Sequence, residues 1–169
     1  AMMGGQYEYG FRDFQSENNY GGYGIMDVSF GVDGTDSMVN LIGYDEGCPL
    51  LTAETISGAS MEYGGFYMTS SAARIFGVES GDEFTFYDLI SMEHTTITIS
   101  DIVENDVLSL MITSKANVAQ IIGRNAEGFN VIISEGPLNI PPELLRKSAS
   151  LEDYRRSTES ALNTARVVL

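Results

Sequence analysis

The residue types that carry nucleophilic catalysis are scarce in this chain, which has one histidine, His94, and one cysteine, Cys48. A Ser-His-Asp or Cys-His arrangement would have to be built on His94. That residue lies in the polar stretch "SMEHTTIT", which is typical of an exposed turn before a strand. Cys48 precedes Pro49 and needs a base nearby to act as a nucleophile, so we interpret it as a small, partly buried thiol. We therefore predict no enzyme and no catalytic residues, and a small hydrolase built on Cys48 or His94 is the third hypothesis.

Carboxylates are plentiful, and their clusters suggest acid–base pairs or a Ca²⁺ site as alternatives. The clusters are Glu79, Asp82 and Glu83; Asp101, Glu104 and Asp106; and Asp33 with Asp36. None has the ligand spacing of an EF-hand, and no glycine pattern forms a dinucleotide or phosphate loop. A zinc site needs about four ligands, mostly Cys and His. We interpret the clusters as solvated turns and predict no metal and no cofactor.

Composition limits the class of protein. A chain of 169 residues suits one domain, or one domain with a tail. Its 9 basic and 24 acidic residues give a net charge of −15, which argues against nucleic acid as a partner and suits an extracytoplasmic location. A single cysteine excludes an internal disulfide. No apolar run reaches the roughly 18 residues of a membrane helix, but the apolar end "ARVVL" suggests that a membrane segment follows.

The elements that position these residues are mostly short. Alternating apolar residues predict strands near 7–11, 25–32, 38–44, 66–70, 81–90, 95–103, 106–113 and 129–134. Hydroxyl caps and a closing glycine predict helices at 72–76, ended by Gly77, and at 115–122, ended by Gly123. Pro141 and Pro142 suit the first turn of a helix, and residues 151–169 carry a clear helical period. We find no internal repeat.

These elements predict an α+β fold: a small mixed or antiparallel sheet or partial barrel, two or three short helices, and a longer C-terminal helix leading to a membrane segment. The stretch "SSAARIFGVESGDEFTFYD" joins one helix to one strand. Ser80, Gly81 and Asp82 are predicted to form the tight turn between them, with Gly81 at positive φ and Asp82 bonding backbone N–H groups. Asp82 is thus interpreted as a turn residue and not as a catalytic acid.

The stretch "GGFYMTSSAARIFGVESGDEFTF", Gly64–Phe86, resembles a segment of the extracytoplasmic domain of FtsX-like, MacB-type permeases of bacterial ABC transporters. The similarity continues in "ITISDIVEN", "LMITSKANVAQIIG" and "FNVIIS". It covers residues 38–134 in outline and is sharpest from 64 to 104. The resemblance implies no catalytic residue, because the ATPase of that family is a separate cytoplasmic protein or domain.

The resemblance implies a non-catalytic domain that lies on the extracytoplasmic side of the cell membrane, contacts substrate or a partner, and couples to membrane helices. Its partners would be a cytoplasmic ABC ATPase, reached through the membrane part, and a twin domain or partner protein. We expect an irregular lead-in at 1–24, an α+β domain at 25–140 and a helical connector at 141–169. The expected contact surface is the aromatic lead-in: Tyr7, Tyr9, Phe11, Phe14, Tyr20 and Tyr23. The alternative is a stand-alone secreted or surface domain that binds a ligand or protein.

Overall fold

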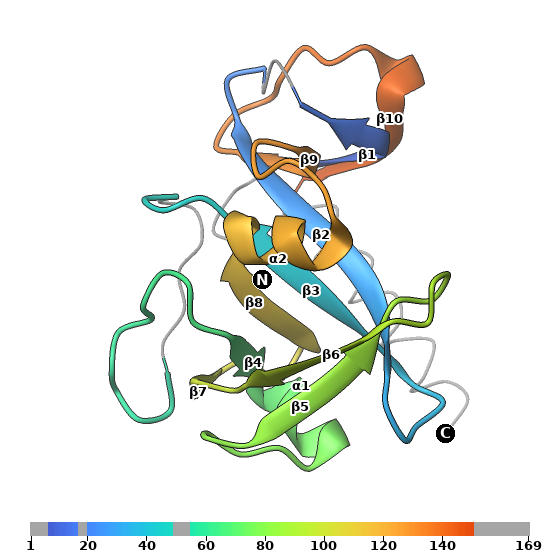
Figure 1. Cartoon of the computed structure of the whole chain (residues 1–169). Helices are drawn as coiled ribbons and strands as arrows, with labels where there is room; N and C mark the ends of the chain where they lie inside the picture. Colours follow the sequence, from blue (N-terminus) through green and yellow to red (C-terminus); the bar gives the residue numbers. More distant parts are fainter. Residues whose placement is uncertain (1–6, 17–19, 49–54, 151–169) are drawn as a thin grey trace, which may run out of the picture.

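The computed structural model describes residues 7–16, 20–48 and 55–150, and this part of the chain is built mainly of strands (Figure 1). Its elements are β1 (Tyr7–Gln15), β2 (Tyr23–Val32), β3 (Met38–Tyr44), β4 (Tyr67–Thr69), α1 (Ser70–Phe76), β5 (Glu83–Tyr87), β6 (His94–Thr98), β7 (Asp101–Val103), β8 (Leu110–Ser114), α2 (Lys115–Ile122), β9 (Phe129–Ser134), the 3₁₀ turn η1 (Pro142–Leu144) and β10 (Leu145–Ser150). The ten strands form one mixed sheet.

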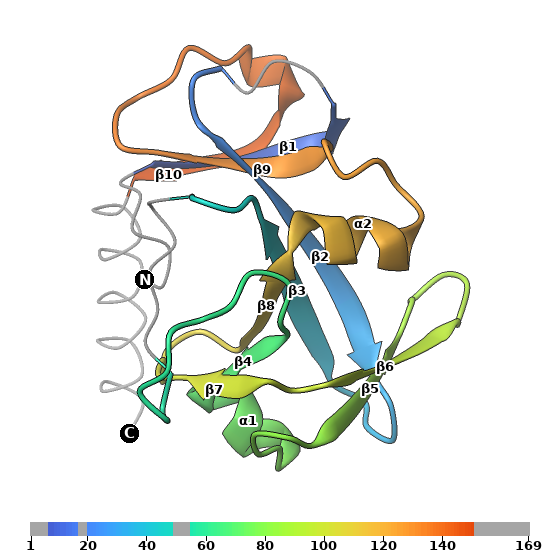
Figure 2. The same ribbon diagram turned by 60° about the vertical axis from the view of Figure 1, so that its left-hand side comes forward.

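Strand β2 is long enough to belong to both ends of the molecule. Its first residues pair with β9, its central residues with β3, and its last two with β5. At the first end the order is β10-β1-β9-β2, and every pair is antiparallel. Figure 2 shows β10, β1 and β9 together at the top of the molecule, with α2 below them and beside β2.

At the other end, the strand pairings and one chain connection form a ring that begins and ends at β2. Strand β3 is parallel to β8, β8 is antiparallel to β4, and β4 is parallel to β7. The chain runs from β6 almost directly into β7, while β6 pairs with β5 and β5 with the end of β2. These contacts make a barrel-like ring. Its core holds Met26, Phe30, Leu41, Met68, Phe86, Ile99 and Met111, each at most 2% exposed.

The two helices, α1 and α2, begin and end in the same way. Each of the antiparallel partners β4 and β8 runs directly into a short helix, and a glycine ends that helix before the next strand begins. Thr69 and Ser114 cap the helices, and Gly77 and Gly123 take φ of 66° and 70° at their ends. The units β4-α1-β5 and β8-α2-β9 thus share the order of strand, capped helix, glycine and strand. Their sequences share little beyond the caps and glycines.

The predicted fold class is wrong in its helical part. The described residues contain only two α-helices, both short, and residues 145–150 form a strand instead of part of a helical connector. Pro141 and Pro142 introduce a 3₁₀ turn, after which the chain pairs with β1 over Tyr7↔Ser150 to Phe11↔Leu145. The predicted helix at 151–169 lies outside the described residues. In the part that is described, no helix is long and apolar enough to cross a membrane.

Candidate functional site

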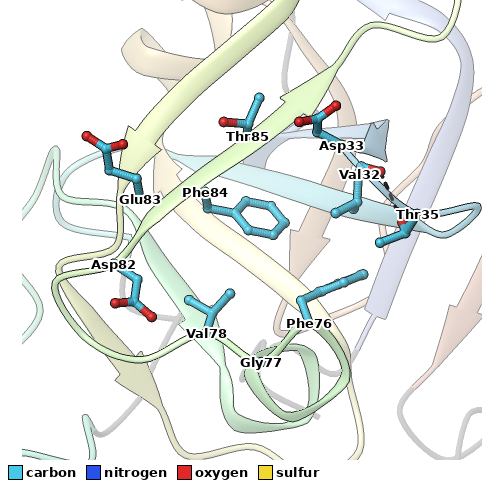
Figure 3. Close-up of a pocket in the computed structure, with 10 residues that line it drawn as sticks. All are labelled: Val32, Asp33, Thr35, Phe76, Gly77, Val78, Asp82, Glu83, Phe84 and Thr85. Carbon is cyan, nitrogen blue, oxygen red and sulfur yellow. Dashed lines mark hydrogen bonds between the residues drawn. The ribbon is translucent and has the colours of Figure 1, made fainter.

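Residues 76–78 and 82–85 line one side of an open cavity of about 430 Å³ (Figure 3). Its walls come from the end of α1, from β5, and from the turn that joins β2 to β3. Figure 3 shows the ring of Phe84 directed toward Phe76, with Val78 beside them. The two rings lie 5.6 Å apart, and Phe84 is only 6% exposed. Aromatic side chains therefore form part of the lining of the cavity.

The rim of this cavity is acidic. Asp33, Asp82 and Glu83 line it, and all three are exposed. Asp82 accepts a hydrogen bond from the N–H of Glu79 at 2.8 Å, and Gly81 has a φ of 89°. The predicted turn at Ser80–Asp82 is therefore confirmed. Asp33 lies 3.5 Å from Nε2 of His94. Such a rim favours neutral or cationic groups over anionic ones.

A second cavity, of about 710 Å³, shares Gly77 and Val78 with the first. Ile56 and Ile102 supply apolar surface, and Arg74 contributes a guanidinium. That guanidinium is engaged, because Nη2 donates to Oδ1 of Asp106 at 2.6 Å. Ser70 donates to the same oxygen at 2.9 Å. These hydrogen bonds, that of Ser70 first, hold the pKa of Asp106 below its usual range.

The two candidate catalytic residues lie in different parts of the fold. Cys48 packs against the cluster of Ile25, Ile42 and Val131. His94 begins β6, where its ring lies 5.3 Å from that of Tyr87. Within the described ranges, no group of three or more His, Cys, Asp or Glu residues is arranged to hold a metal ion. The geometry supplies cavities and surfaces for binding, and it does not bring Cys48 and His94 together as nucleophile and base.

The aromatic residues of the lead-in are largely packed inside. Tyr9 and Phe11 are 8% and 2% exposed, and Phe11 meets Phe129 edge-on with ring centroids 5.7 Å apart. Tyr7 and Tyr20 pack against the same cluster. The guanidinium of Arg124 lies over the ring of Phe14, with Cζ 4.3 Å from the ring centroid. Tyr23 is the most exposed of the six, at 41%. A contact role for these residues stays a prediction.

Two features had no signal in the sequence. Lys115 is buried at 3% exposure, at the start of α2, where an amphipathic helix usually presents lysine to water. Its partner Asp45 is 70 positions away in sequence, so only the tertiary structure pairs them. The cavities are likewise formed by segments that meet only in the fold.

The fold is that of an extracellular domain found in a transporter of the ABC type. The solved structure that shows this is the extracellular domain of the noncanonic ABC-type transporter YknZ from Gram-positive bacteria, with a TM-score of 0.53 and 10% identity. The match covers 77% of this chain and 83% of that one. It confirms, at the level of the fold, the resemblance seen in Gly64–Phe86.

A domain of a permease protein from Porphyromonas gingivalis also matches, with a TM-score of 0.40 and 12% identity over 79% of this chain and 60% of that one. No protein-family model and no curated protein matches the sequence.

Proposed function

We propose that this chain is a non-catalytic extracytoplasmic domain of an ABC transporter permease. The observation that carries the proposal is the fold shared with the extracellular domain of YknZ. The separation of Cys48 from His94 agrees with a binding role. In this role the domain contacts substrate or a partner protein and transmits the contact to membrane helices.

The proposal also concerns the partners. The domain is anchored at the cell membrane through the permease, and a cytoplasmic ABC ATPase binds the membrane part. A twin domain or another protein meets the domain outside the membrane. The aromatic lead-in offers Tyr23 for such a contact, because this residue is 41% exposed.

Cysteine labelling in intact cells tests the location. In the full-length gene product, Cys48→Ser removes the one cysteine of this domain, and Ser91→Cys adds one in the exposed loop between β5 and β6. A membrane-impermeant maleimide should label the double variant without permeabilisation, and the Cys48→Ser variant should show no label in this domain. Labelling that requires lysis would overturn the proposal.

Fractionation of the same cells separates the proposal from its alternative. A permease domain stays in the membrane fraction after carbonate extraction and copurifies in detergent with an ABC ATPase. Release into the medium would favour a stand-alone secreted or surface binding domain instead.

A further inference from the structure

Strand β6 has a free edge. It pairs with β5 alone, in the antiparallel register Glu83↔Thr98 to Tyr87↔His94, and no other described strand pairs with it. The bonds Asp88 N–H to Glu93 O and Ile99 N–H to Asp82 O place the backbone groups of residues 93 and 99 toward β5. Bonding alternates along an antiparallel strand, so 95 and 97 also face β5. The N–H and C=O groups of His94, Thr96 and Thr98 therefore point away from it.

This edge lacks the devices that usually protect an edge strand. Its sequence, "HTTIT", contains no proline, no lysine and no bulge, and threonine and isoleucine favour extended backbone. The edge of β7 shows the contrast, because it is covered. The N–H of Ile56 donates to the carbonyl of Ile102 at 2.8 Å, and Thr55 bridges Val103. Figures 1 and 2 both show the loop end of the β5–β6 hairpin projecting from the body of the molecule.

The hairpin is also held in a fixed shape. Oδ1 of Asp88 accepts hydrogen bonds from the N–H groups of Ile90 and Ser91, both at 2.8 Å. These backbone bonds, that to Ser91 first, hold the pKa of Asp88 below its usual range. Across the strands, the hydroxyls of Thr85 and Thr96 lie 2.7 Å apart. The loop presents apolar side chains to water, with Ile90 95% and Met92 56% exposed. Little ordering entropy would be lost here when a partner binds.

Charge selects among the partners that the edge could take. The strand itself carries only His94, but carboxylates surround it: Asp33 beside His94, Glu83 opposite Thr98, and Asp88 and Glu93 at the loop. A second copy of this chain would bring the same carboxylates and its own net charge of −15 against them. A segment with lysine or arginine would meet opposite charge instead.

We propose that the free edge of β6 is a docking site for an extended, positively charged segment of a partner polypeptide, which adds as a further strand. Backbone hydrogen bonds to His94, Thr96 and Thr98 supply the affinity in this mode, and the surrounding carboxylates select a basic sequence. The exposed apolar loop residues contact the end of the same segment. The inference does not depend on the membrane location, because it rests on the β5–β6 hairpin alone.

Amide hydrogen exchange with a defined peptide tests the proposal. The probe is Lys-Val-Thr-Val-Thr-Val-Lys, added to the 169-residue chain, with the same peptide carrying Glu in place of both Lys as a control. The basic peptide should slow exchange at the amides of His94, Thr96 and Thr98 and leave those of Thr95 and Ile97 unchanged. Protection at the walls of either cavity instead, or equal binding of both peptides, would overturn it.

Two matched changes at Thr96 separate the contribution of its backbone N–H from that of its side chain. Thr96→Pro deletes one outward N–H without removing a bond to β5, and it should raise the Kd of the basic peptide at least tenfold. Thr96→Val keeps the N–H and should change the Kd less than threefold. Two N-methylated forms of the peptide, blocked on opposite sets of alternate amides, make the same test on the unchanged chain, and the form whose methylated amides face β6 should bind at least tenfold more weakly. Binding that survives N-methylation on both sets of alternate amides, each tested separately, would overturn the proposal, and so would a peptide-free dimer that buries β6.

Discussion

Nζ of Lys115 lies 3.2 Å from Oδ2 of Asp45, and the two side chains differ sharply in exposure, at 4% and 63%. The ammonium also lies 6.0 Å from the ring centroid of Phe129. Lys115 begins α2, Asp45 follows β3, and Phe129 begins β9. This one side chain therefore connects the helix to both ends of the molecule.

Removal of the Asp45 carboxylate should lower the free energy of unfolding more than removal of the Lys115 ammonium. Asp45→Ala leaves a buried cation without its charged partner and should lower the free energy of unfolding by about 1–3 kcal/mol. Lys115→Met keeps the apolar stem and removes the charge, so it should cost no more than about 1 kcal/mol. Urea unfolding measures both. Asp36→Ala, in an exposed turn, is the control. Equal losses of unfolding free energy for Asp45→Ala and Lys115→Met would show that the buried ammonium does not need Asp45 as its charged partner.

The cap of α1 does more than end a helix. Thr69 is fully buried, and its Oγ1 accepts from the N–H of Ala72 at 3.3 Å and from the N–H of Leu110 at 3.1 Å. Thr69→Val should leave both N–H donors, one buried and one part-buried, without this acceptor and lower the free energy of unfolding by about 2–4 kcal/mol. Thr69→Ser keeps the hydroxyl and should cost less than about 1.5 kcal/mol. Thermal unfolding of the two variants checks this, and similar losses would mean that the methyl group matters more than the hydroxyl.

The local features around α1 were readable from the sequence because each depends on a few neighbouring residues. Gly77 and Gly123 end their helices at positive φ, and Asp82 bonds the backbone of its own turn. These are short-range geometric requirements, so the stretch predicts them without its partners. The exposure of Cys48 and His94 was also predicted from their neighbouring residues: His94 is exposed and Cys48 is half-buried, as expected.

The features that sequence reasoning missed all depend on distant pairing. Residues 145–150 form a strand because β1 lies beside them, and no local pattern identifies that partner. The same pairing, together with β9, places Tyr9 and Phe11 in a core, although their glycine-rich surroundings suggested an irregular segment. Tertiary context overrides local propensity most easily in such short elements.

Asp106 should make the chain more sensitive to acid. Hydrogen bonds from Ser70 and Arg74 lower its pKa in the folded state. A carboxyl with a depressed folded pKa contributes stability above its unfolded pKa, near 4, and loses that contribution as pH falls through the folded value. Asp106→Asn should therefore flatten the fall in unfolding free energy between about pH 4 and pH 2. Urea unfolding across this range measures it, with Glu104→Gln as the exposed control. Parallel curves for wild type and Asp106→Asn would contradict the assignment.

Gly43 sets the distance between α2 and β3. A Cβ at this position would lie 2.7 Å from Cγ2 of Val118 and 3.0 Å from the Cα of Lys115, which is backbone and cannot rotate away. Gly43→Ala should therefore push the helix from the sheet and lower the free energy of unfolding by about 1–3 kcal/mol. Amide exchange in α2 should become faster, because the helix loses contact with β3.

A matched pair of variants separates this clash from a general effect of alanine. Gly136 has open space around it, so Gly136→Ala should change the free energy of unfolding by less than about 0.5 kcal/mol. The double variant Gly43→Ala with Val118→Ala removes the closest clashing atom, so the two losses should be less than additive by about 0.5 kcal/mol or more. Strict additivity, or equal losses at Gly43 and Gly136, would show that the helix does not rest on this glycine. Because Lys115 begins the same helix and pairs with Asp45, amide exchange near Asp45 should be slower in the double variant than in Gly43→Ala alone.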